Sequence, residues 1–199
     1  MKKKKYLGIA LVVIGISIIA IALGLKYTSM STERKLREQY EETLKGLETG
    51  ETSQNNEKEK SPDNAIDKED VDAIGIMVIP KINVKVLVVE GTGDEVLKYY
   101  VGHFKDTALP GEEGNFAVAG HRNYIYNEMF RDIGQLEEND DIIVRTKKGE
   151  YTYKVKEQKV IEPTDVEVLN KTKNATITLI TCTPGGKKRL IVTGELSKK

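Results

Sequence analysis

The chain contains a single cysteine, Cys182, among its 199 residues. One cysteine excludes an intramolecular disulfide framework, a CxxC redox pair and a Cys-rich zinc site. Cys182 ends the apolar run 178–181 and precedes a Pro-Gly-Gly turn. A strand end beside a loop is where a rigid scaffold presents reactive groups. The residue is therefore a candidate nucleophile, and the alternative is a buried cysteine that acts as a small hydrophobic side chain.

A catalytic thiol needs a base or a positive field, because at its free pKa it is mostly protonated at neutral pH. The two histidines are the candidate bases: His121 follows the apolar run 116–120, and His103 lies next to an expected loop. Arg189 begins the last apolar run and could stabilise a thiolate or a developing oxyanion. Lys187 and Lys188 are expected to be solvated charges of the turn.

Other kinds of site have little support. A metal trio of His103, His121 and Cys182 lacks a compact ligand pair. Gly-Thr-Gly at 91–93 lacks the continuation of a phosphate-binding loop. Six acidic side chains could bind calcium, but solvated turn charge is the better interpretation: Glu112, Glu113, Glu137, Glu138, Asp140 and Asp141. We therefore expect no metal or other cofactor. The 12 aromatic residues and the net charge of zero argue against nucleic-acid binding.

The net charge is a sum over three unlike segments. Residues 1–30 carry a charge of +5, residues 31–72 carry −6, and residues 73–199 carry +1. Hydrophobic residues are scarce in the second segment and abundant in the third. We therefore predict an anchor (1–30), a juxtamembrane helix with a flexible acidic linker (31–72) and a folded domain (73–199).

Tyr6 to Leu25 is a run of twenty residues without a charge, long enough as a helix to cross a bilayer. Four lysines precede it, and the positive-inside rule keeps them in the cytoplasm. The prediction is a single-pass cell-membrane protein with its folded domain outside the cell. A cleaved signal peptide, suggested by Ala20-Ile21-Ala22, is the alternative.

A narrow apolar stripe follows, formed by Leu36, Tyr40, Leu44 and Leu47 at helical spacing. We expect a solvated juxtamembrane helix here, and a dimerising or lid-like helix is the alternative. Residues 49–72 are rich in charged and small polar side chains and are expected to form a flexible tether.

Residues 73–199 contain short β-branched or alternating runs, typical of an all-β domain with a closed barrel or a sandwich. Short helices are plausible at Asp94–Tyr100 and Asn127–Ile133. Strands are expected at 74–79, 84–89, 116–120, 141–146, 150–158, 176–181 and 190–196.

Several of these residues resemble the motifs of sortases, the cell-wall transpeptidases of Gram-positive bacteria. Thr178-Leu179-Ile180-Thr181-Cys182 resembles the TLxTC signature, Ala119-Gly120-His121 resembles the catalytic-histidine strand, and Arg189 resembles the catalytic arginine. The resemblance covers about 74–196, including the Ala108-Leu109-Pro110-Gly111 stretch.

The resemblance implies an eight-stranded β-barrel and a thiol-protease-like chemistry that ends in transpeptidation. Cys182 would cleave an LPxTG-like sorting signal of a secreted protein and form a thioester. His121 would be the general acid and base, and Arg189 would hold the carbonyl or oxyanion. An amine of a cell-wall precursor or of a pilin would be the acceptor.

The resemblance also places residues in the signal-binding groove. Thr178 and Ile180 match groove positions, and Ala119, Thr181, Asn115 and Arg122 are further candidates. The short Cys182–Arg189 loop favours class D, with a class A-like enzyme as the alternative. The acidic partner of His121 is left open among Asp106, Asp132 and Glu195.

Two other functions compete with this interpretation. One is a non-catalytic extracellular adaptor, in which Cys182 would be buried and unreactive. The other is a cysteine peptidoglycan transpeptidase of another fold, although its Ser-His-Gly-Cys type of motif is missing.

Overall fold

A computed structural model of the chain describes residues 2–49, 72–123 and 129–198. The long helix α1 (Lys2–Thr49) precedes a barrel, and α2 (Asp94–Leu97) is short. The strands are β1 (Ala73–Ile79), β2 (Val84–Glu90), β3 (Val101–His103), β4 (Gly114–Ala119), β5 (Asp141–Thr146), β6 (Gly149–Ile161), β7 (Ala175–Cys182) and β8 (Arg189–Lys198). Single turns of 3₁₀-helix form η1 (Pro80–Ile82), η2 (Ile133–Gln135) and η3 (Glu167–Leu169).

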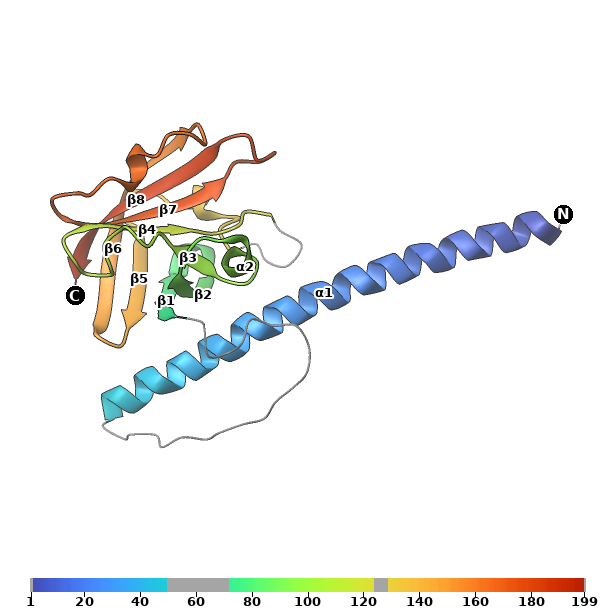
Figure 1. Ribbon diagram of the computed structural model, residues 1–199, viewed down its shortest axis with the longest axis horizontal. Helices are drawn as coiled ribbons and strands as arrows, with labels where there is room; N and C mark the ends of the chain where they lie inside the picture. Colours follow the sequence, from blue (N-terminus) through green and yellow to red (C-terminus); the bar gives the residue numbers. More distant parts are fainter. Residues whose placement is uncertain (1, 50–71, 124–128, 199) are drawn as a thin grey trace.

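The eight strands close into a barrel in the order β1-β2-β3-β4-β7-β8-β6-β5, with β5 pairing back onto β1 (Figure 1). The pairs β2–β3 and β4–β7 are parallel, and the other pairs are antiparallel. Inward-facing side chains, among them Met77, Phe116, Tyr153 and Leu179, fill the barrel with the ring of Phe130. The predicted closed eight-stranded barrel is thus confirmed.

Each of the seven runs expected to form a strand does so, and the eighth strand, β3, has only three residues. The first expected helix is shorter than predicted, because α2 ends at Leu97. The prediction of a second helix at Asn127–Ile133 is wrong for the described residues of that range. Residues 127 and 128 lie outside the described residues, and residues 129–132 form turns before η2.

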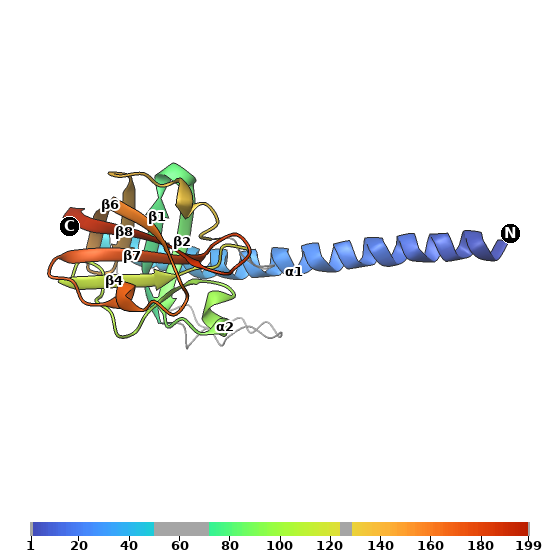
Figure 2. The same ribbon diagram turned by 90° about the horizontal axis from the view of Figure 1, so that it is seen from above.

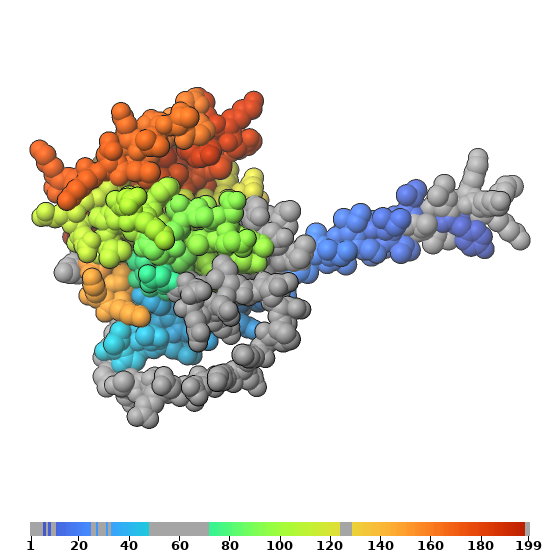
Figure 3. All heavy atoms as spheres, viewed as in Figure 1, coloured from blue at the N-terminus to red at the C-terminus, as the bar shows by residue number. Residues whose placement is uncertain are grey.

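Helix α1 packs against the barrel instead of standing in solvent (Figures 1 and 3). Tyr40 is 7% exposed and its hydroxyl donates a hydrogen bond of 2.9 Å to the Ile74 carbonyl. Its ring joins a second apolar cluster with Ile76, Leu87 and Tyr100, and Leu36 and Leu44 pack at the margin. The prediction of a solvated helix is therefore wrong for this part of α1.

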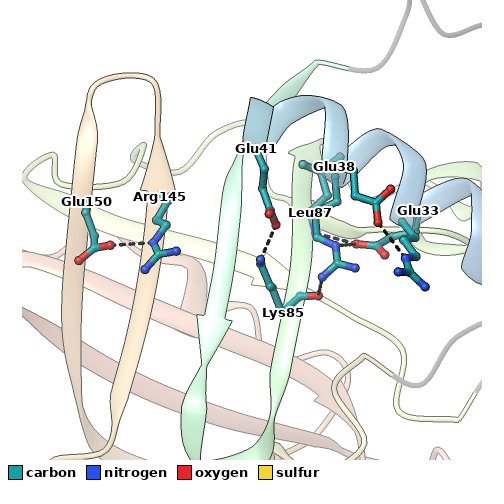
Figure 4. A network of polar contacts seen from close by, with 9 residues as sticks. Glu33, Glu38, Glu41, Lys85, Leu87, Arg145 and Glu150 are labelled. Atoms are coloured by element: carbon teal, nitrogen blue, oxygen red, sulfur yellow. Dashed lines mark hydrogen bonds and ion pairs between the residues drawn. The ribbon is translucent and has the colours of Figure 1, made fainter. Parts of the chain in front are cut away.

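The helix also covers an open strand edge. Because β3 pairs only with Val88–Glu90, the earlier half of β2 has no neighbouring strand on that side among the described residues. The Leu87 amide donates to the Glu33 carboxylate at 3.1 Å, and the Arg37 guanidinium donates to the Lys85 carbonyl at 2.9 Å (Figure 4). Glu33 and Arg37 form an i,i+4 ion pair at 3.4 Å. One ion pair thus replaces the donor and acceptor that a strand would supply.

Glu33 is 8% exposed, and burial raises the pKa of its carboxyl group above the usual value, while Arg37 and the Leu87 amide oppose this shift. Beside this pair, Glu41 binds Lys85 at 2.6 Å. The described C-terminal half of α1 is therefore part of the folded domain.

The N-terminal half of α1 projects away from the barrel (Figure 2). Its described apolar side chains, such as Leu11, Val13, Ile16 and Ile21, are more than half exposed. Within the part of the chain that the structure describes, no helix combines the length and apolar character needed to cross a membrane. The predicted tether at 50–71 lies outside the described residues.

We predict that Glu33→Ala lowers the free energy of unfolding by about 1–3 kcal/mol, because it leaves the buried Leu87 amide without an acceptor. Glu33→Gln should lose less, since the amide oxygen can still accept that hydrogen bond and no charge is buried. Denaturant unfolding of the full chain measures both. Glu42→Ala, at an exposed position of the same helix, is the control, and equal stability of the Glu33→Ala variant and the wild type would refute the edge-capping role.

Candidate active site

Strand register brings the candidate nucleophile and base together. In the parallel β4–β7 ladder, Ala119 pairs with Ile180, and the Gly120 amide donates to the Ile180 carbonyl at 3.1 Å. His121 and Cys182 each lie two residues beyond this pair, so they leave adjacent strands at the same level. Neighbouring strands are about 4.8 Å apart. The two side chains therefore reach the same end of the barrel.

Arg189 approaches Cys182 from the other side. The antiparallel β7–β8 ladder ends with Cys182 opposite Arg189. Cys182 is a free, partly exposed thiol. The Arg189 guanidinium donates to the carbonyls of Gly186 and Lys188, both at 3.3 Å, which keeps it beside its own loop. The register thus sets the thiol between the positions of His121 and Arg189.

The turn between β7 and β8 is closed by its own hydrogen bonds. The Thr183 amide donates to the Lys188 carbonyl at 3.0 Å, and the Gly186 amide donates to the Thr183 carbonyl at 2.8 Å. Gly185 and Gly186 have φ values of +82° and +74°, a region that favours glycine. Lys188 pairs with Glu162 at 2.7 Å in a solvent-exposed ion pair, which contributes little to stability.

His121 is held by the residues around its backbone. The Phe130 amide donates to the His121 carbonyl at 3.0 Å, and the Thr181 hydroxyl donates to the Gly120 carbonyl at 2.8 Å. A Cβ at Gly120 would lie 2.8 Å from the Phe130 ring, so a larger residue would displace that ring or the strand end. Thr181 is buried on the face of β7 opposite to Cys182, so its contact positions the histidine strand.

Half-burial of the imidazole lowers the pKa of His121, and the negative charge of Asp94 opposes this shift. Among the residues that the structure describes, Asp94 at the start of α2 is therefore a carboxylate whose charge acts on the imidazole. Glu195 lies opposite Thr176, at the far end of the β7–β8 ladder from Cys182. The sequence marks Asp94 only as a helix start after Gly93, which gives no sign of its distance from His121.

His103 is a structural residue of the barrel. Its side chain is 1% exposed, with Nδ1 3.0 Å from the Glu90 carboxylate and Nε2 3.1 Å from the Ala108 carbonyl. Its ring lies 5.2 Å from that of Phe116. His103 therefore ties β3 to β2 and to the loop before β4, and both of its nitrogens are occupied.

The candidate groove residues lie on and beside β7. Ile180 is partly exposed next to Ala119, whereas Thr178 and Asn115 are each 3% exposed. The Thr178 hydroxyl donates to the Asn115 side-chain oxygen at 2.7 Å, and the Asn115 amide donates to the Val168 carbonyl at 2.8 Å. These two bonds tie η3, in the β6–β7 connection, to the strands beneath it. Arg122 is partly exposed directly after His121.

The acidic side chains considered for calcium do not gather into a cluster. Lys81 pairs with Glu137 at 2.5 Å and with Asp140 at 3.0 Å, and Lys154 pairs with Asp141 at 2.7 Å. Within residues 2–49, 72–123 and 129–198, no group of three or more potential metal ligands is found.

A cysteine flanked by a histidine and an arginine at the open end of a barrel has the composition of a covalent acyl-transfer site. Comparison with known proteins specifies the class. The family model of the sortase domain matches residues 77–197. Sortase D of Bacillus subtilis is 31% identical over 174 residues, which cover 84% of this chain and 85% of that protein.

Sortase A of Listeria monocytogenes is 34% identical over 132 residues, covering 65% of this chain and 59% of that protein. Among solved structures, a sortase D5 transpeptidase of Clostridium perfringens is 36% identical, with a TM-score of 0.67 over 84% of this chain and 99% of that one. The chain therefore belongs to the sortase family, which consists of cysteine transpeptidases of the cell wall.

We predict that Asp94→Asn lowers the pKa of His121 further, because it removes a negative charge that favours the imidazolium. Histidine NMR titration of the full chain measures this shift, with the His121 signal assigned by its absence in His121→Ala. Glu95→Gln, the neighbouring residue of α2, is the matched control. An unchanged or raised pKa of His121 in Asp94→Asn would show that this carboxylate does not act on the imidazole.

Proposed function

We propose that this chain is a membrane-anchored cysteine transpeptidase of class D type. It cleaves an LPxTG-like sorting signal and transfers the protein to an amine of the cell wall or of a pilin. The observation that carries the proposal is the strand register, which sets Cys182 level with His121 on one side and opposite Arg189 on the other. The resemblance of the sequence to the sortase motifs assigns the three roles.

In the first half-reaction, the Cys182 thiolate attacks the carbonyl carbon of the threonine in the signal. The tetrahedral oxyanion lies within reach of Arg189, whose guanidinium cannot lose its charge. As the C–N bond breaks, the His121 imidazolium gives its proton to the departing amine. The products are a thioester on Cys182, a neutral imidazole and a released peptide amine.

In the second half-reaction, an acceptor amine attacks the thioester carbonyl, and the His121 imidazole takes the proton that the amine loses. Collapse of the tetrahedral intermediate expels the Cys182 thiolate and leaves a new amide bond. The thiolate–imidazolium pair is then restored. A half-buried imidazole, whose pKa is lowered by burial and raised by a nearby carboxylate, suits a residue that must both give and take a proton.

The anchoring proposal rests on the sequence of Tyr6–Leu25 and on the course of α1. The helix continues without interruption from the lysines at its start to the part packed on the barrel. The C-terminus, where β8 ends, lies on the side of the barrel opposite to the N-terminus of α1 (Figures 1 and 2). The first residue of β8, Arg189, therefore lies on the side toward which α1 projects. An anchor at Tyr6–Leu25 would therefore turn the active-site end toward the membrane.

The partial exposure of the thiol favours an enzyme over a non-catalytic adaptor, which would bury Cys182. Membership of the sortase family favours a sorting-signal transpeptidase over a peptidoglycan transpeptidase of another fold.

We predict that Cys182→Ala abolishes cleavage of an LPxTG-type peptide by the full chain. His121→Ala should lower kcat/KM about 10²–10⁴-fold through the loss of acid–base catalysis. Arg189→Ala should lower it about 10²–10³-fold through the loss of oxyanion stabilisation.

The measurement is peptide cleavage with and without an amine acceptor, combined with mass spectrometry of the thioester. Lys187→Ala, an exposed side chain of the same turn, is the control and should retain wild-type activity. Full cleavage and transfer by Cys182→Ala would overturn the proposed function.

A further inference from the structure

The outer face of β7 continues well beyond the catalytic end. Alternate residues of a strand point to the same face, and Ile177 and Leu179 point into the barrel core. Cys182, Ile180, Thr178 and Thr176 therefore form one column on the outside. The ladders extend this column sideways, with Thr193 opposite Thr178 and Glu195 opposite Thr176 on β8.

At the far end of this column lies a concavity of about 450 Å³, which begins at Thr178 and includes Thr176, Asn115 and Thr193 in its base. The β6–β7 connection forms a wall, and the bond from Asn115 to the Val168 carbonyl holds that wall in place. The hollow is therefore a defined feature of the outer face of the strand that also carries Cys182.

Lysine dominates the charge of this concavity. Lys156 and Lys159 reach it from β6, and Lys171 and Lys173 reach it from the β6–β7 connection. Two carboxylates oppose them, and one of these, Glu195, accepts a hydrogen bond of 2.6 Å from Asn174. In the described part of the chain, none of the four lysines forms an ion pair, so their charges are available to a ligand.

The spacing matches the length of a sorting signal. Four residues of extended chain span about 13 Å, at about 3.3 Å per residue, and four residues of β7 also separate Cys182 from Thr178. A signal whose scissile carbonyl lies at Cys182, and whose chain follows β7, therefore ends where the lysine-lined concavity begins. The next residues of the substrate protein would enter it.

We propose that this concavity binds the segment of the substrate immediately before the sorting signal and selects acidic residues there. The inference rests on the proposed function and adds a second element of specificity to it. Because the lysines are exposed, each pairing is weak and screened by salt, so several together are needed for a measurable preference.

The test uses the full chain in non-ionic detergent and three peptides, in which three Glu, three Gln or three Lys precede the same LPxTG-type signal. We expect kcat/KM to follow the order Glu, Gln, Lys, with a difference of about five-fold between the first two. The difference should appear in KM and should shrink at 0.5 M salt.

The double variant Lys171→Glu/Lys173→Glu should reverse the order of the peptides. The control Lys35→Glu/Lys148→Glu changes the same net charge at exposed positions outside the concavity and should keep the wild-type order. If the reversal variant does not unfold cooperatively on heating, Lys171→Gln/Lys173→Gln replaces it and should abolish the preference for Glu.

Equal kcat/KM for the three peptides in the wild type would overturn the inference. The inference would also fail if the Lys171/Lys173 variants ranked the three peptides in the same order as the wild type. Cleavage of none of the peptides would instead refute the proposed function, because the Gln-led peptide makes no demand on the lysines.

Discussion

The parallel pairing of β4 with β7, continued by the antiparallel β8, is the constraint on which the site depends. Side chains alternate between the two faces of a strand, so a slip of one residue would turn Cys182 into the barrel and Thr181 outward. The buried residues of β7, Ile177 and Leu179, oppose such a slip because they fill the core. The same burial that stabilises the barrel therefore presents the thiol at its surface.

The edge of β2 depends on a second interaction, because the strands alone leave it uncovered. β3 is too short to cover β2, and an uncovered edge leaves backbone groups without partners. Glu33 and Arg37 of α1 satisfy one donor and one acceptor there. Burial of the carboxylate opposes this gain, and Tyr40 adds apolar contact that helps to offset that cost. Helix α1 is thus joined through β2 to the barrel that carries the site.

Electrostatics distinguishes the two ends of the outer face of β7. At the catalytic end, burial lowers the pKa of His121, and the negative charge of Asp94 opposes this shift. At the other end, exposed lysines surround a polar concavity whose base is held by the bonded side chains of Thr178 and Asn115. The first environment suits proton transfer, and the second suits weak recognition of a charged chain.

The sequence by itself determined the strands of the apolar runs, and it singled out Cys182 and Arg189 as candidates for the site, because these are local patterns. It missed β3, which is only three residues long, and it could not tell what covers the stripe of Leu36, Tyr40 and Leu44, since an apolar face does not name its partner. It offered three carboxylates as candidate partners of His121 and omitted Asp94, because separation along the chain does not give separation in space. It also grouped Thr181 with the groove, although alternation along β7 turns this side chain toward the histidine strand. Only the tertiary structure decided these points, because barrel closure fixes which distant residues face one another.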